Sequence, residues 1–195
     1  MATLFVDKVD PQSGTALEIG SSGDTITIPS GCTITNNGTQ TGFGGVMTPY
    51  FLAYRNATYT ISSATWTKVV FDAEDFDTAS GFNVSTGVYT VQTAGKYYFE
   101  YSVRSESQGG SATSSRQYAY LQRDRGGSAT QRANPGLDFR NNYGTGGTLH
   151  GATILDCNAN DTVEIYLYHA TTSGSVTVVE GSYRPTYFLG YKIIE

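Results

Sequence analysis

The feature that most constrains the fold is a line of aromatic and turn residues that runs from Phe71 to Tyr101. From Gly95 onward this line alternates with a period of two, which predicts a half-buried strand. One face of that strand would carry Tyr97, Phe99, Tyr101 and Val103. Gly95 lets the chain turn tightly into the strand, because glycine has no Cβ.

Across the whole line, eight residues follow a specific spacing: Phe71, Asp77, Phe82, Tyr89, Gly95, Tyr97, Phe99 and Tyr101. The pattern resembles the signature of the globular head of complement component 1q, a trimeric jelly-roll family related to tumour necrosis factor. It departs from that signature at Tyr89, where the family has phenylalanine. A tyrosine fills the same apolar position if its hydroxyl reaches water or a partner. The resemblance implies an all-β jelly-roll sandwich that forms a homotrimer.

The composition fits a β-rich surface protein. Charged residues make up only 15% of the chain, while 23 glycines and 15 tyrosines supply turn and strand residues. The net charge of −5 disfavours nucleic-acid binding, which needs a basic face. No apolar run reaches the roughly 18 residues of a membrane span. The start of the chain lacks a secretion signal, so we expect synthesis in a cytoplasm and no membrane insertion.

Residues 1–45 differ from the rest. Residues 25–28 recur as residues 33–35, and each unit reads as a very short strand followed by a turn. One such pair is not stable alone, so we expect it to wind with two further copies or to lie against another protein. The alternative is a flexible tail, against which regularly placed apolar residues argue. These are Leu17, Ile19, Ile26, Ile28 and Ile34.

The stretch from Val6 to Leu17 resembles the opening of fibre and appendage proteins of marine bacteriophages, of the cyanophage kind. This resemblance implies that residues 1–45 form a β-rich stalk that attaches to other virion proteins, with a jelly-roll head over 46–195. Residues 41–45 read as a hinge between the two. Cys32 and Cys157 would then lie in different domains, as two free, part-buried thiols rather than a disulfide.

Within the head, alternation and turns predict strands over residues 49–54, 66–71, 84–92, 95–105, 117–123, 148–156, 162–170, 175–179 and 183–194. Residues 162–170 are apolar at both alternating sets of positions, which predicts a strand buried on both faces, either inside the sandwich or at a subunit contact. We expect the core or the subunit contact to contain Phe71, Phe82, Tyr89, Gly95, Tyr97, Phe99, Tyr101, Val163, Ile165, Phe188 and Gly190.

Sequence motifs of catalysis are missing: there is no nucleophile elbow, Walker loop or His-Glu-x-x-His run. We expect His169 to be a surface residue near a turn, and His150 to lie in a flexible glycine-rich loop. The densest acidic cluster could offer oxygen ligands to Ca²⁺, and some relatives of the complement head hold calcium. Its members are Asp72, Glu74, Asp75 and Asp77. Alternation would spread them over two faces, which favours a solvated acidic turn, so we expect no cofactor and keep calcium as the alternative.

Two predicted loops, residues 105–115 and 123–143, remain for recognition, because loops on a rigid sandwich carry variable function. Guanidinium forks and aromatic rings suit carbohydrate or protein contact. The candidate ligand-binding residues are Arg123, Arg125, Arg132, Arg140 and Tyr143. The alternative is that these loops are simply solvated or form trimer contacts.

Together these features predict a non-enzymatic structural and binding protein of a bacteriophage virion. It would be a tail-fibre tip that binds a host-surface glycan or protein. A capsid decoration or head-fibre protein that stabilises the shell is the alternative within the same class. From other classes, a polysaccharide depolymerase needs a longer β-helix than this chain can form, and a secreted complement- or cytokine-like ligand needs a signal peptide.

Overall fold

The computed structural model describes residues 9–38, 47–108, 114–132, 136–138, 146–181 and 183–193. The chain divides into two compact units, Met1–Phe43 and Gly44–Glu195, and each is described by itself. The predicted hinge at residues 41–45 lies outside the described residues. No helix in the described ranges is long and apolar enough to cross a membrane.

The first unit, over its described residues 9–38, forms turns but no strand or helix. Its turns are held locally, as where Ser21 N donates to Asp24 Oδ2 at 2.7 Å. Its apolar side chains are exposed, with Ile19 at 65% and Ile26 at 59%. The short strands predicted here therefore do not form within a single copy. A two-stranded pair this short leaves too much of its backbone and apolar surface in contact with water.

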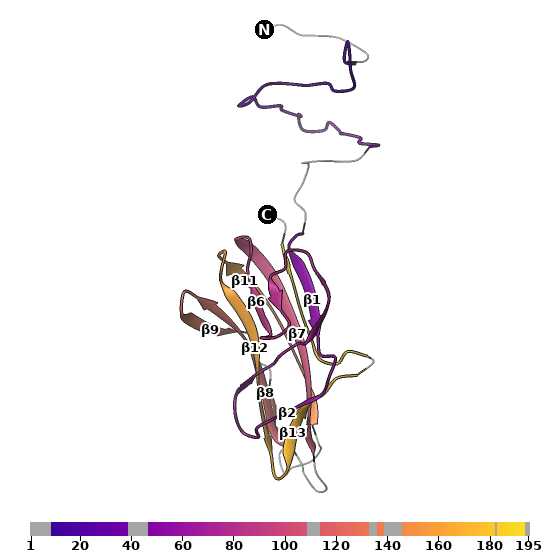
Figure 1. The fold of residues 1–195 in the computed structure, drawn as a ribbon. Helices are drawn as coiled ribbons and strands as arrows, with labels where there is room; N and C mark the ends of the chain where they lie inside the picture. The colour runs from indigo at the N-terminus through magenta and orange to yellow at the C-terminus, as the bar shows by residue number, and fades with distance from the viewer. Residues whose placement is uncertain are drawn as a thin grey trace. The chain divides into compact units, whose positions relative to one another are not determined.

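The second unit is an all-β sandwich of two antiparallel sheets (Figure 1). Sheet A has the order β2-β13-β7-β14-β1-β4, with β11 also paired to β7. Its strands are β1 (Tyr50–Tyr54), β2 (Tyr59–Ile61), β4 (Ala73–Asp77), β7 (Gly95–Gln108), β11 (Gly146–Cys157), β13 (Ser175–Val178) and β14 (Tyr187–Lys192). The predicted jelly-roll class is confirmed, and the described residues of the head contain no helix.

Sheet B has the order β10-β8-β12-β6-β5, with β3 paired to β12 and β9 paired to β8. Its strands are β3 (Thr67–Lys68), β5 (Phe82–Asn83), β6 (Val88–Thr90), β8 (Ser114–Arg125), β9 (Ser128–Arg132), β10 (Gly136–Asp138) and β12 (Thr162–Thr171). In Figure 1, β8 and β12 belong to one layer, and β1 and β7 to the other.

The long strands follow the predicted alternation, but several boundaries differ. The described parts of the predicted loop at residues 105–115 are strand, because β7 continues to Gln108 and β8 already begins at Ser114. The strands predicted over 66–71 and 84–92 shrink to two and three residues. The short strands β2, β4, β5, β9 and β10 were not predicted, since backbone pairing with another strand defines them rather than an alternating pattern of their own.

Aromatic rings fill the centre of the sandwich. Phe51 stacks on Tyr89 with ring centroids 4.2 Å apart, and Tyr97 stacks on Phe99 at 5.6 Å. These four side chains are at most 1% exposed. Gly190 lies opposite Phe99 in the pairing of β14 with β7, and a Cβ at Gly190 would lie 2.5 Å from the Phe99 ring. A glycine is therefore required there to make room for the ring.

The two cysteines are free, as predicted, although Cys32 is exposed and only Cys157 is buried. Within the single chain β12 is buried on one face only, so the sandwich interior does not cover both faces, and burial of the second face at a subunit contact stays a prediction. Ile165 and Leu167 are completely buried between the sheets, whereas Tyr166 and Tyr168 are only half-buried on the outer face of sheet B. The outer tyrosines pack against tyrosines of β8 instead of entering the core.

Candidate functional site

The acidic cluster lies on strand β4 and the residue just before it, at the edge of sheet A, not in a turn. Its members are Asp72, Glu74, Asp75 and Asp77. Asp77 Oδ2 accepts the backbone N–H of Phe82 at 2.7 Å, whereas Asp75 pairs with Arg184. Asp75 and Asp77 thus serve separate structural partners. Among the described residues, no group of three or more His, Cys, Asp and Glu side chains is arranged to hold a metal ion.

His150 lies on strand β11, on the outer face of sheet A, and not in a flexible loop. Its Nε2 is 2.9 Å from Glu100 Oε1, which also accepts the hydroxyl of Tyr187 at 2.7 Å. Tyr98 donates to the other carboxylate oxygen at 2.7 Å. Partial burial disfavours the charged carboxylate, but these hydrogen bonds outweigh it and lower the pKa of Glu100. The hydrogen bond to Glu100 raises the pKa of Tyr98 to about 12.

His169 is completely buried, so the prediction of a surface histidine is wrong. Ser105 Oγ lies 2.8 Å from His169 Nδ1, and Gln117 Nε2 lies 3.1 Å from the same nitrogen. A serine beside a histidine is the arrangement of an activated nucleophile. Here Ser105 is 1% exposed and His169 is 0% exposed, so a substrate has no access to the pair. Burial lowers the pKa of His169 to about 4.

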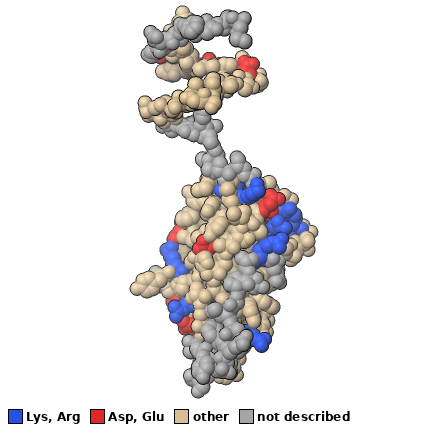
Figure 2. All heavy atoms as spheres, turned by 180° about the vertical axis from the view of Figure 1, so that it is seen from behind, with Lys and Arg blue, Asp and Glu red and all other residues tan. Residues whose placement is uncertain are grey.

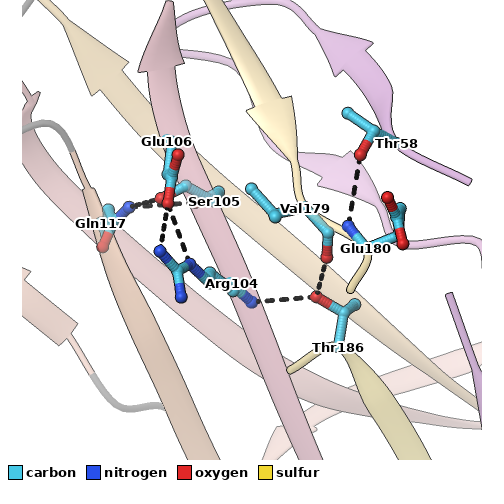
Figure 3. Close-up of polar contacts among 8 residues, drawn as sticks. All are labelled: Thr58, Arg104, Ser105, Glu106, Gln117, Val179, Glu180 and Thr186. Atoms are coloured by element: carbon cyan, nitrogen blue, oxygen red, sulfur yellow. Dashed lines mark hydrogen bonds and ion pairs between the residues drawn. The ribbon is translucent and has the colours of Figure 1, made fainter. Parts of the chain in front are cut away.

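Polar groups connect strand β7 with the segment between β13 and β14 (Figure 3). The backbone N–H of Arg104 donates to Thr186 Oγ1 at 3.1 Å, and that hydroxyl donates to the Val179 carbonyl at 2.8 Å. The Arg104 guanidinium donates through Nε to Glu106 Oε1 at 2.9 Å on the same strand. Figure 3 also shows Gln117 reaching across to Ser105. These contacts satisfy buried backbone groups and hold the sheet together.

Two of the predicted ligand-binding arginines have structural roles within the chain. Arg123 and Arg125 lie on strand β8 rather than in a loop, and both donate to the Asp156 carbonyl at 2.8 Å. Arg125 also binds Asp161, whose side chain is 2% exposed, with its Nε 2.9 Å from Oδ2. Burial opposes the charge on Asp161, but the Arg125 hydrogen bonds and a backbone N–H outweigh it and lower its pKa. Both arginines therefore fasten β8 to the connection between β11 and β12.

Arg132 lies at the exposed end of strand β9. Arg140 and Tyr143 lie outside the described residues. Of the three candidate arginines that the structure describes, Arg123 and Arg125 share a partner, the Asp156 carbonyl. Figure 2 shows one face of the head on which charged side chains are few and most of the surface is uncharged.

Apart from Gly95, which is half-buried, the residues assigned from sequence to the core or subunit contact line the interior of the sandwich. Phe71, Tyr89, Tyr97, Phe99, Tyr101, Val163, Ile165 and Phe188 are 0% exposed, and Phe82 is 8% exposed. Gly95 opens β7 with a φ of +147°, close to the side chain of Lys192, where a Cβ would lie 2.4 Å from Lys192 Cε.

The outer face of sheet A carries an apolar surface that the sequence reading did not identify. Pairing of adjacent strands places one row of side chains across four strands: Tyr50, Tyr191, Tyr98 and Ile154. A second row contains Phe76, Leu52 and Leu189, followed by Glu100. A groove of about 590 Å³ lies along β4, β1 and β14 in this region. We call these two rows the apolar face of sheet A.

The model of the C1q domain matches residues 50–192 of the chain. The chain belongs to the C1q family. C1q and tumour necrosis factor-like domains are generally non-enzymatic binding modules that typically form trimers. In this C1q domain, both histidines, Asp75, Asp77, Arg123 and Arg125 contact other groups of the same chain.

Solved structures share the fold at low sequence identity. The globular domain of zebrafish complement 1qA has 20% identity and a TM-score of 0.53, covering 74% of this chain and 97% of that one. Murine APRIL at pH 5.0 has 9% identity, a TM-score of 0.56 and coverages of 74% and 98%. Eiger TNF from S. frugiperda has 12% identity, a TM-score of 0.55 and coverages of 74% and 93%. No curated protein matches the chain.

Proposed function

We propose that this C1q domain forms a homotrimer through the apolar face of sheet A and acts as a non-enzymatic binding head. The observation that carries the proposal is the composition of that face. Three of its large apolar side chains are strongly exposed in the single chain: Phe76 at 45%, Tyr50 at 39% and Ile154 at 58%. Contiguous exposed apolar surface of this kind marks interaction sites, and burying it stabilises an assembly by about 25 cal/mol per Å².

The polar group within the face also fits a subunit contact. Glu100 lies opposite Leu189 in the pairing of β14 with β7 and receives hydrogen bonds from Tyr98 and Tyr187. A carboxylate whose hydrogen bonds are already satisfied is tolerated at a contact that excludes water. The face therefore needs no rearrangement of these groups before it is covered.

Leu189→Glu should convert the trimer into a folded monomer. The new carboxylate would lie at the centre of the apolar face and directly opposite Glu100, so burying it would cost several kcal/mol. Sedimentation equilibrium should give about three times the 20.9 kDa chain mass for the wild type and a single chain mass for the variant.

Ser128→Glu is the matched control, since it adds the same charge at an exposed position on β9 of sheet B. It should leave the trimer intact. A wild-type chain that sediments as a monomer, or a Leu189→Glu variant that remains trimeric, would contradict the proposal.

We further propose that the trimer belongs to a bacteriophage particle, with residues 1–45 as the stalk that binds other virion proteins. Support comes from the resemblance of residues 6–17 to phage fibre proteins and from the exposed isoleucines of residues 9–38, which three wound copies would bury. The head would then bind a glycan or protein of the host surface, as a fibre tip. Arg132, Arg140 and Tyr143 remain predicted contacts. A capsid decoration or head-fibre role is the alternative position on the particle.

Electron microscopy of intact particles labelled with an antibody against the head tests this role. A few dozen labels confined to the tail are expected for a fibre tip, whereas hundreds over the shell would indicate a decoration protein. Particles that carry no label, alongside a positive control for another virion protein, would exclude both positions.

A further inference from the structure

The outer face of sheet B carries a cluster of aromatic rings, which we call the aromatic platform. It consists of Trp66, Tyr118, Tyr120, Tyr166 and Tyr168. Register pairs Tyr166 with Tyr120 and Tyr168 with Tyr118 across strands β12 and β8. The rings of Tyr120 and Tyr166 are stacked with centroids 5.2 Å apart. Trp66, just before β3, lies 4.6 Å from Tyr120 and 5.5 Å from Tyr168.

The platform belongs to the outer surface of the sandwich. The residues that alternate with its tyrosines, such as Leu121 and Leu167, are 0% exposed and fill the inner face of the same strands. Trp66 is 42% exposed, and Tyr168 is half-buried beside it. The rings hold one another in place by tilted and stacked contacts, so their faces are fixed before any ligand arrives.

A polar rim borders the platform on one side. Glu164 lies two residues before Tyr166, on the same face of β12. Its Oε1 accepts hydrogen bonds from Gln122 Nε2 at 3.2 Å and from the Tyr166 hydroxyl at 3.1 Å. Its Oε2 is 3.1 Å from Lys68 Nζ. The carboxylate and the ammonium balance each other, so the rim offers hydrogen-bond donors and acceptors without a net charge. Burial raises the pKa of Tyr166 to about 12.

We propose that the aromatic platform binds a neutral carbohydrate. The C–H face of a pyranose ring packs on an aromatic ring, and its hydroxyls match a rim of carboxylate, amide and ammonium groups. This pairing of fixed rings with a charge-balanced polar rim complements a ligand that is apolar on its faces, polar on its edge and uncharged. The inference rests on the proposed role of the domain as a binding head and assigns the ligand class.

The size of the platform also favours a sugar over a protein. A tyrosine or tryptophan buries about 150–250 Å² in full, and Tyr120 is already almost covered, at 6% exposed. The five rings therefore offer only roughly 300 Å² of open surface. A stable protein contact covers about 800 Å² on each partner. One or two sugar rings match the smaller area.

The chain contains a single tryptophan, so its fluorescence reports on the platform alone. The trimeric wild-type protein should bind one or more neutral glycans on a glycan array. The same purified oligosaccharide, added in solution, should then shift the Trp66 emission in a saturable manner. Tyr168→Ala should weaken that binding by about tenfold or more, because a stacking ring contributes about 1–3 kcal/mol. Trp66→Ala, measured by calorimetry, should have a similar effect.

Tyr183→Ala is the matched control, since Tyr183 is 99% exposed and lies outside the platform. It should bind the glycan as the wild type does. A blank array, binding confined to acidic glycans, or full affinity in Tyr168→Ala would each overturn the inference. Sedimentation of the same samples distinguishes failure of the glycan site from failure of the proposed trimer. A trimer that binds no glycan contradicts the glycan site alone, and a monomer that binds a glycan contradicts the trimer alone.

Discussion

Phe99→Ala is expected to lower the free energy of unfolding by about 3–5 kcal/mol, a large fraction of the stability of a domain. Phe99 is 0% exposed and its ring contacts those of Tyr97, Phe51 and Phe188. Gly190 makes room for this ring and for the ring of Phe51 beside it. Truncation therefore removes contacts on every side and leaves a cavity that the rigid aromatic neighbours cannot fill. Chemical denaturation at a fixed protein concentration gives the change directly.

The same substitution should also dissolve the trimer and abolish binding, because β7 carries Phe99 inward and Tyr98 outward onto the apolar face of sheet A. Tyr183→Ala, at a 99% exposed position, should change stability by less than about 0.5 kcal/mol. A Phe99→Ala variant with an unchanged melting temperature would mean that Phe99 is not a core residue, and the assignment of β7 would fall with it.

The sequence predicted best those features that repeat along one strand. Alternation around Tyr97 and Phe99 located β7 and its inward face, because the period of a strand is built into the chain. The same rule could have found the burial of His169, which continues the inward series of Ile165 and Leu167 two residues further on. The prediction went wrong there because a polar residue at the end of a run was read as the end of the strand.

Features that depend on pairing between distant segments could not be read in this way. The carboxylate partner of Arg125 is Asp161, which lies just before β12. The pairing of β8 with β12 brings the two residues together. The tyrosine pairs at alternate positions in β8 and β12 are visible in the sequence, but the register that stacks Tyr120 on Tyr166 is set by the fold. Both faces proposed for recognition are products of register between strands.

A second large effect is expected on acidification, and His169 is its cause. Burial lowers the pKa of His169 from 6.5 to about 4. As the pH falls below 6.5, the unfolded chain takes up a proton at this position while the folded chain does not. The stability contributed by the neutral buried ring is therefore complete above that pH and is lost progressively towards pH 4. The loss over this window amounts to about 3 kcal/mol.

Urea denaturation between about pH 7 and about pH 4, at one protein concentration, measures this slope. His169→Gln should lower the stability at neutral pH, because Ser105 and Gln117 lose the ring that they contact, but the variant should lose less stability on acidification. His150→Gln is the matched control: the His150 side chain is 53% exposed, so that variant should keep most of the wild-type slope. Equal slopes for the wild type and His169→Gln would show that the buried histidine does not govern acid stability, and carboxylates such as Asp161 would then carry it.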